Sequence, residues 1–213
     1  LDDGWTLMVH LGMSGRMTFT GETPVAVDKH DHIEFQTDDG AIVRFNDPRR
    51  FGFMDLIPTE ELKTHPMLAS LGPEPLSNSF NAISLSEALR GRKTPIKTAL
   101  LNQKIVAGLG NIYACESLFR ASISPKRFAY TIPGKRATRL VTVIRDVLKA
   151  AIDDGGSSLR DYVQTDGTLG YFQAKWRVYN REGETCAHED CGGTIRRIVQ
   201  SGRSTFYCGK HQR

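Results

Sequence analysis

The sequence of 213 residues has no long hydrophobic run, because no apolar stretch approaches the ~20 residues that a membrane-spanning helix needs. It also has few cysteines, only four, and three of them fall at or after residue 186. This pattern excludes a disulfide framework and favours a reducing compartment. No signal peptide is visible at the start. Because the chain begins at Leu1 rather than Met, in what resembles the middle of a strand, we expect it to be a fragment without its natural start.

Acidic residues are scarce toward the C-terminus. The net charge is +4, and residues 175–213 carry eight Lys and Arg against four Asp and Glu, whereas the first 174 residues carry 20 of each sign. The basic excess therefore lies in one segment, which is the electrostatic footprint expected of a surface that binds a polyanion. A solvated basic face is the alternative interpretation of so small an excess.

The C-terminal segment contains a candidate zinc site with the spacing C-x4-C-x16-C-x2-H, formed by Cys186, Cys191, Cys208 and His211. Zn²⁺ prefers four such ligands in a tetrahedron, and two close pairs on either side of a β-hairpin supply them. Residues 194–199 and 203–207 predict the two strands, with Gly202 at the turn. His188 lies between the first two cysteines and competes for the fourth position, although the spacing of the second pair favours His211.

The first 57 residues predict antiparallel strands at 5–11, 16–20, 32–36 and 41–45, with turns at 12–15 and 38–40. Met13 lies between glycines in a turn, and Arg49, Arg50 and Phe51 share one loop. A methionine or aromatic that enters a base stack, beside arginines that hold phosphate, is one way to grip distorted DNA. On these residues alone, Phe51 as the start of a core strand is the better interpretation. His30 and His32 are typical of structural or surface histidines.

The middle of the chain predicts helices after a linker at 71–75. We expect them over 84–90, 96–102, 112–121 and 137–153, with Thr94 and Asn111 as N-caps. From Ala88 to Cys115 there is no acid, and a helix begins just after Gly108 and Gly110, which favours a phosphate site over a plain helical hairpin. Residues 164–173 predict either a recognition loop or a plain connection.

Six motifs in order carry a family resemblance, namely His10–Gly15, Lys29–His32, Asp47–Gly52, Leu71–Leu76, Gly108–Tyr113 and the zinc hairpin. Together they closely resemble bacterial formamidopyrimidine-DNA glycosylases, the base-excision enzymes for oxidised purines. The resemblance extends over nearly the whole chain. It implies an α+β multidomain fold with a partial N-terminal β-sandwich (1–72), a helix–two-turn–helix domain (73–175) and a C-terminal β-hairpin zinc finger (176–213).

The resemblance also implies functional roles for individual residues. Met13, Arg49 and Phe51 would fill the gap left by a flipped-out nucleotide. His30, Arg49, Arg92 and Asn111 would hold phosphates, Lys97 would lie close to the lesion pocket, and Arg203 would donate a proton in strand cleavage. Residues 164–173 would close over the flipped base. The partner would be damaged double-stranded DNA and the cofactor one structural Zn²⁺, in a monomer without membrane contact in the bacterial cytoplasm, near the nucleoid.

Two departures from the family pattern stand out. The usual finger is C-x2-C-x16-C-x2-C, whereas here the first pair is wider and His211 takes the last place; a Cys₃His set still binds zinc. The family's nucleophile, an N-terminal proline that forms a Schiff base, would lie ahead of Leu1. We therefore expect the natural protein to be a bifunctional glycosylase and lyase, and the 213-residue chain alone to excise no base. The alternatives are a non-catalytic zinc-dependent DNA-binding protein and a structural zinc-ribbon protein.

Overall fold

The computed structural model describes residues 1–20, 26–157 and 170–213, which form two compact units. The β unit comprises residues 1–69 and 154–174, and the helix–zinc unit comprises residues 70–153 and 175–213. The helices and the zinc hairpin thus share one unit, and the three-part division at residues 72 and 175 stays a prediction. Most of the expected recognition loop, 164–169, lies outside the described residues. Among the helices that are described, none is long and apolar enough to cross a membrane.

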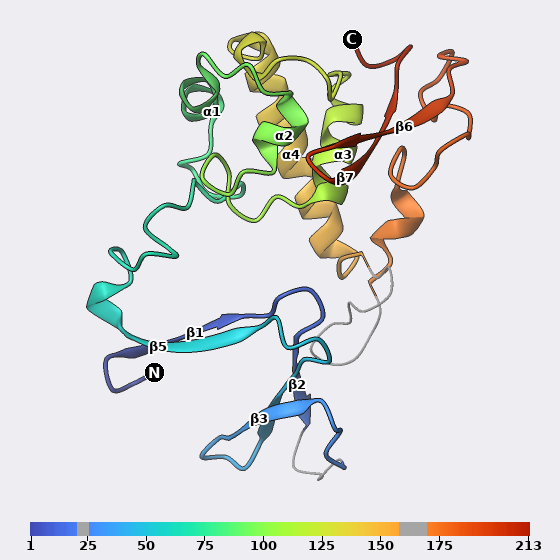
Figure 1. Ribbon diagram of the computed structural model, residues 1–213. Helices are drawn as coiled ribbons and strands as arrows, with labels where there is room; N and C mark the ends of the chain where they lie inside the picture. Colours follow the sequence, from blue (N-terminus) through green and yellow to red (C-terminus); the bar gives the residue numbers. More distant parts are fainter. Residues whose placement is uncertain (21–25, 158–169) are drawn as a thin grey trace. The chain divides into compact units, whose positions relative to one another are not determined.

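The β unit contains two antiparallel sheets (Figure 1). In the first, β1 (Trp5–His10) pairs with β5 (Phe53–Pro58), so that His10 lies opposite Phe53. In the second, β4 (Ile42–Asn46) lies between β2 (Arg16–Thr20) and β3 (Asp31–Gln36). The short helix η1 (Thr59–Glu61) follows β5. The strands predicted from alternating apolar residues are therefore confirmed, and β5 is added to them.

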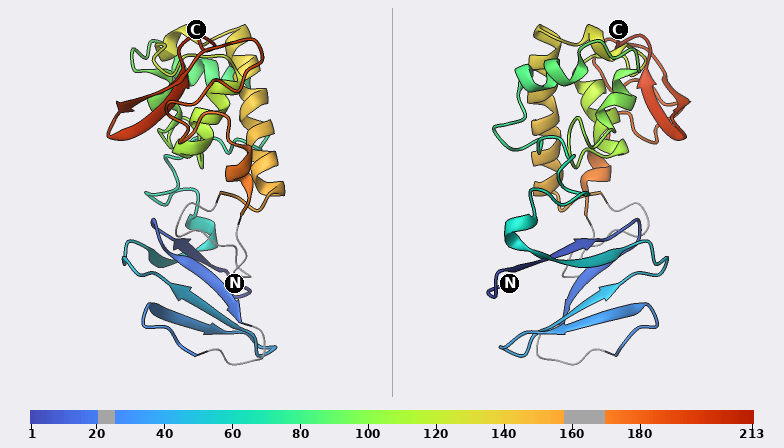
Figure 2. Two further views of the ribbon diagram at one scale, coloured as in Figure 1. Left: turned by 90° about the vertical axis from the view of Figure 1, so that its right-hand side faces the viewer. Right: turned by 60° about the vertical axis from the view of Figure 1, so that its left-hand side comes forward.

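The helix–zinc unit is built around α4 (Lys135–Asp153), which lies beside the shorter helices in both views of Figure 2. Leu140, Ile144 and Val147 bury one face of α4 completely, because apolar residues recur at helical spacing. Leu140 and Ile144 pack in one core with residues of α1 (Ala82–Leu89), α2 (Ile96–Leu100) and α3 (Asn111–Arg120). The short helix η2 (Ala129–Thr131) belongs to the same unit, and η3 (Phe172–Lys175) lies where the chain re-enters it.

The helix positions are confirmed to within a few residues, but both predicted caps are wrong. Pro95 and Gly110 occupy the N-cap positions of α2 and α3, and neither helix has a side-chain cap. Asn111 is instead the first helical residue, and its amide donates outside the helix. The Asn111 side chain bonds to Tyr179 and Ser204 instead of capping the helix, and local sequence does not encode such a tertiary contact.

The zinc hairpin consists of β6 (Ile195–Gln200) and β7 (Arg203–Cys208), paired in register from Ile195 opposite Cys208 to Gln200 opposite Arg203. Ser201 and Gly202 join the strands, and both have positive φ, of 49° and 73°. Two such residues make the tight turn that matches the twist of a β-hairpin. The predicted hairpin is confirmed, and its turn presents Arg203 to solvent.

Candidate zinc centre and nucleic-acid interface

Three cysteine thiols meet at the base of the β6–β7 hairpin. The Sγ atoms of Cys186, Cys191 and Cys208 lie within 4.8 Å of one another, and those of Cys191 and Cys208 are 3.7 Å apart. Two sulfurs bound tetrahedrally to one zinc at about 2.3 Å are separated by about 3.8 Å. All three cysteines are buried and reduced. The donor set therefore fits Zn²⁺, as the sequence spacing predicted.

The surroundings of the thiols are consistent with a metal-stabilised cluster. A Cβ on Gly193 would lie 2.6 Å from the Cys208 sulfur, so only glycine fits there. Burial raises the pKa of the Cys186 thiol to about 12. Burial acts in the same direction on Cys208, but backbone N–H groups of His211 and Lys210 outweigh it and lower the pKa of that thiol. A bound cation would allow all three neighbouring sulfurs to ionise together.

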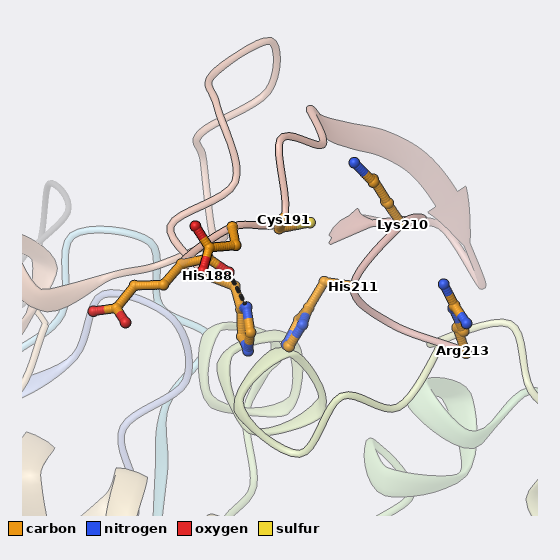
Figure 3. A pocket seen from close by; sticks show the side chains of 7 residues that line it. His188, Cys191, Lys210, His211 and Arg213 are labelled. Atoms are coloured by element: carbon orange, nitrogen blue, oxygen red, sulfur yellow. Dashed lines mark hydrogen bonds between the residues drawn. The ribbon is translucent and has the colours of Figure 1, made fainter.

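The fourth ligand stays a prediction. Among the described residues, neither His211 nor His188 joins the group of sulfur ligand atoms. Figure 3 shows the two imidazoles side by side, and their ring centroids are 4.1 Å apart. His211 Nε2 lies 3.0 Å from the carbonyl oxygen of Phe119, a bond in which the imidazole must donate. A ligating histidine commonly donates its other nitrogen to such a carbonyl, and Nδ1 of His211 then remains for the metal.

The turn of the zinc hairpin is anchored to the helices by three side-chain hydrogen bonds. Asn111 Nδ2 donates to the carbonyl oxygen of Ser204 at 3.0 Å. The hydroxyls of Thr98 and Ser201 are 3.4 Å apart, and Gln200 Nε2 donates to Pro125 O at 3.3 Å. These contacts bring the start of α3 and the turn that carries Arg203 together, although they are far apart in the sequence. The predicted phosphate site at Asn111 and the predicted strand-cleavage residue Arg203 thus lie on one surface.

A buried carboxylate holds the segment that leads into the zinc site. Glu116 of α3 is fully buried, and Oε1 accepts backbone N–H groups of Arg177, Val178 and Tyr179 at 2.9–3.1 Å. Arg177 N also lies 3.0 Å from Oε2. The hydroxyl of Tyr179 accepts from Asn111 Nδ2 at 3.3 Å, and its ring meets Phe206 of β7 edge-on. Glu116 therefore fixes the contact between α3 and the zinc hairpin.

Lys97 is completely buried on α2, and among the described residues its ammonium has no hydrogen-bond partner. Burial lowers the pKa of Lys97, and the nearby positive charge of Arg203 lowers it further, against an opposing effect of Cys115. In the part of the chain that the structure describes, no carboxylate shifts the pKa of Lys97, and two neighbouring cations of this kind favour an anionic ligand. Lys97 thus lies near Arg203 in the helix–zinc unit, and its place close to the lesion pocket stays a prediction.

Arg92 occupies another part of the helix–zinc unit. Its Nε donates to Ala88 O at 2.6 Å, and its own carbonyl accepts the Tyr130 N–H at 3.0 Å. No described contact joins it to Asn111. Its predicted role in phosphate binding remains a prediction.

In the β unit, Asp47 joins the two loops that carry the predicted DNA-gap residues. This fully buried carboxylate accepts the Ser14 hydroxyl at 2.9 Å and the backbone N–H groups of Gly52 at 2.8 Å and Arg49 at 3.3 Å. The bond from Gly52 is the chief cause that lowers the pKa of Asp47, and the Ser14 hydroxyl adds to it against the effect of burial. The carboxylate therefore holds the 12–15 turn against the 47–52 loop.

The two loops also approach each other directly. Gly12 has φ +64°, and a Cβ there would lie 2.8 Å from the backbone carbon of Phe51. Met13 and Phe51 are nevertheless 72% and 57% exposed, and the guanidinium of Arg49 lies over the Phe51 ring at 4.8 Å. The interpretation of Phe51 as a core residue is wrong. A rigid pair of loops presents a thioether, an aromatic ring and a cation to solvent.

The loop that bears His30 is tied to the same carboxylate loop. His30 O accepts the Asp47 N–H at 3.0 Å, and the His30 N–H donates to Asp28 at 2.8 Å. His32 Nε2 donates to Asp47 O at 2.9 Å, which is the structural role expected for a lone histidine.

Sequence analysis missed Asp47 as an anchor and Glu116 altogether. The one available signal for Glu116 was its position directly after an acid-free run of 28 residues, 88–115.

Comparison with known proteins agrees with this organisation. The chain matches the Formamidopyrimidine-DNA glycosylase N-terminal domain at residues 1–54, the Formamidopyrimidine-DNA glycosylase H2TH domain at 71–163, and the zinc finger found in FPG and IleRS at 183–210. It is 61% identical to the formamidopyrimidine-DNA glycosylase of Rhodospirillum centenum, covering 97% of this chain and 74% of that protein. For the corresponding protein of a Ruegeria species the identity is 57%, with 100% and 78% covered.

Solved structures show the same fold. The MutM (Fpg) protein of Thermus thermophilus superposes with a TM-score of 0.84 at 39% identity, covering 98% of this chain and 76% of that one. The Lactococcus lactis Fpg in complex with DNA containing an abasic site superposes with a TM-score of 0.86 at 33% identity, covering 98% and 75%. The resemblance inferred from six motifs is confirmed: the chain belongs to the formamidopyrimidine-DNA glycosylase family.

Proposed function

We propose that this protein acts in base-excision repair as a DNA glycosylase and abasic-site lyase that removes oxidised purines, such as 8-oxoguanine and formamidopyrimidines, from duplex DNA. The observation that carries the proposal is the exposure of Met13 and Phe51 on two loops that Asp47 locks together. Apolar side chains in solvent are costly to maintain unless they enter an apolar site in a partner. An unstacked base step is such a site.

The helix–zinc unit would supply the phosphate contacts. The first turn of α3 has no side-chain cap, so its N–H groups remain available to an anion beside Asn111. Arg203 adds an exposed positive charge at the hairpin turn, and the buried Lys97 adds a second one near it. In the β unit, Arg49 and His30 would hold phosphates near the flipped nucleotide, and Arg203 would protonate a leaving oxygen during strand cleavage.

The zinc ion would be structural. Cys186, Cys191 and Cys208 would bind it, with His211 Nδ1 as the fourth ligand. When bound, the ion neutralises the thiolates and holds the base of the β6–β7 hairpin. Zinc content and extended X-ray absorption of wild type, His211→Ala and His188→Ala would test the ligand set. Loss of one nitrogen neighbour in His211→Ala alone supports the proposal, whereas the same loss in His188→Ala alone assigns His188 instead.

Borohydride trapping on a duplex with 8-oxoguanine tests the activity of the protein as its natural gene encodes it. A covalent adduct supports a Schiff-base glycosylase and lyase. Tight binding to an abasic-site duplex with no adduct would favour the alternative, a non-catalytic zinc-dependent DNA-binding protein. An adduct with dihydrothymine duplex but not with 8-oxoguanine would contradict the proposed purine specificity.

A further inference from the structure

An exposed aromatic pair lies on a part of the helix–zinc unit that the proposed function leaves without a role. The rings of Phe128 and Tyr130 stack with centroids 5.8 Å apart and planes 16° from parallel. Their exposed fractions are 49% and 46%. Two large apolar rings kept together in solvent indicate a surface with a ligand.

The backbone holds this pair in place. Residues 92–96 run antiparallel to residues 127–130, through the bonds Ile96 N to Arg127 O, Ala129 N to Thr94 O and Tyr130 N to Arg92 O, at 2.7–3.0 Å. Phe128 is the N-cap of η2, and Ala129 and Tyr130 are its first two residues. Ala129 is buried in the core, while its two aromatic neighbours are about half exposed. The exposure follows from the fold of the loop and not from a frayed segment.

The charge around the rings is of one sign. From Ser117 to Arg145 the sequence has seven Lys and Arg and no Asp or Glu. Lys126 is exposed, and a depression of about 420 Å³ is lined by Lys126, Arg127 and Phe128 together with polar residues. Arg92 joins this surface through its backbone bond to Tyr130. We call these five residues, Arg92, Lys126, Arg127, Phe128 and Tyr130, the Phe128 surface.

The Phe128 surface begins beside the hairpin turn that carries Arg203. Gln200, the last residue of β6, donates to the carbonyl oxygen of Pro125, and Lys126 follows directly. A nucleic-acid strand that leaves the Arg203 site therefore has a basic and aromatic surface next to it.

We propose that the Phe128 surface binds unpaired nucleotides of a DNA strand, by stacking of bases on Phe128 and Tyr130 and by phosphate contacts to the surrounding cations. Every base has a flat face, so aromatic rings beside Lys and Arg bind single strands without reading their sequence. In a paired duplex the bases stack on one another and offer no free face to Phe128 and Tyr130. The surface therefore selects unpaired over paired DNA. This site is additional to the proposed lesion site and does not depend on the lesion that is excised.

The test is the binding of a fluorescent oligothymidine of about ten nucleotides, followed by anisotropy in the full-length protein. Loss of one stacked base weakens such binding about tenfold or more, so Phe128→Ala/Tyr130→Ala should bind about tenfold or more weakly. The same variant should keep its affinity for a blunt abasic-site duplex within about twofold. Ile83→Ala is the matched control, because Ile83 is an apolar residue of α1 that is 72% exposed.

Phe128→Trp keeps a flat aromatic ring and should therefore retain oligothymidine binding. Retained binding would show that the alanine variant binds weakly because it lacks stacking, and not because it is misfolded. Equal binding by the wild type and the double alanine variant would overturn the proposal. So would displacement of the oligonucleotide by poly-glutamate with no effect of the aromatic substitutions, which would show a surface for acidic peptides. Because the duplex assay is read separately, failure of this inference leaves the proposed repair activity unaffected.

Discussion

Replacement of Glu116 should detach the zinc hairpin from α3 more effectively than any surface substitution. Its carboxylate is fully buried and accepts N–H groups from three consecutive residues, Arg177 to Tyr179. A hydrogen bond to a charged group contributes about 1.5–3 kcal/mol, and each buried donor left unpaired costs about 1–3 kcal/mol. Glu116→Gln keeps one acceptor oxygen but turns an amide N–H toward Arg177 N. We expect it to lower the free energy of unfolding by about 2–4 kcal/mol, and Glu116→Ala by at least about 3 kcal/mol.

The assay is urea unfolding followed by tryptophan fluorescence in a Trp5→Phe background. Trp176 then reports on the helix–zinc unit alone, since its ring meets Tyr179 edge-on at 5.1 Å. Glu87→Gln is the matched control, because Glu87 is an exposed glutamate of α1. Glu116→Gln should also weaken binding to an abasic-site duplex, because Glu116 holds Tyr179 and the Tyr179 hydroxyl accepts a hydrogen bond from Asn111. An unfolding free energy of Glu116→Gln within about 0.5 kcal/mol of wild type would refute this reasoning.

Three further changes test other parts of the structure. Asp47→Asn should lower the melting temperature at neutral pH. Because the pKa of Asp47 is lowered from 3.8 in the folded state, its contribution to stability is present above pH 3.8 and is lost as the pH falls further, so the two melting temperatures should approach each other only below that pH. Lys97→Met should raise stability by about 0.5–2 kcal/mol while weakening abasic-duplex binding, because a buried unpaired charge is removed. Cys208→Ser should abolish stoichiometric zinc in metal analysis and make the hairpin sensitive to proteolysis.

Local sequence was sufficient for the features that depend on neighbours along the chain. Helical periodicity located α4, and alternation with a glycine turn located the β6–β7 hairpin. The cysteine spacing predicted the thiol cluster, because the sulfur ligands of one zinc must lie about 4 Å from each other whatever the rest of the fold does. Helical periodicity and strand alternation act over a few neighbouring residues, and the geometry of metal–ligand bonds tolerates little variation.

Features that depend on residues distant in sequence were not predictable. Asn111 is a residue type that commonly caps helices, yet its amide donates to the carbonyl oxygen of Ser204, which lies 93 residues later in the sequence. A lysine on a short helix would ordinarily be exposed to solvent, yet Lys97 is fully buried. Phe51 was better explained as a core residue until the fold showed Gly12 packed against its backbone and its ring in solvent. In each case a tertiary contact overrides the local preference of the side chain.

Both buried carboxylates accept hydrogen bonds from backbone N–H groups, Asp47 in the loop that carries Arg49 and Phe51 and Glu116 in the segment that leads into the zinc site. Asp47 accepts the N–H of Arg49, while the guanidinium of that arginine lies over Phe51. Glu116 likewise accepts the N–H of Arg177 and its two successors. A carboxylate paired with the guanidinium of Arg49 would neutralise the charge that a phosphate needs, whereas one that binds the backbone makes the loop rigid and leaves that cation available. The acid-free run from Ala88 to Cys115 fits the same requirement, since an acid near the proposed phosphate surface would have to be buried and satisfied by N–H donors, as Glu116 is.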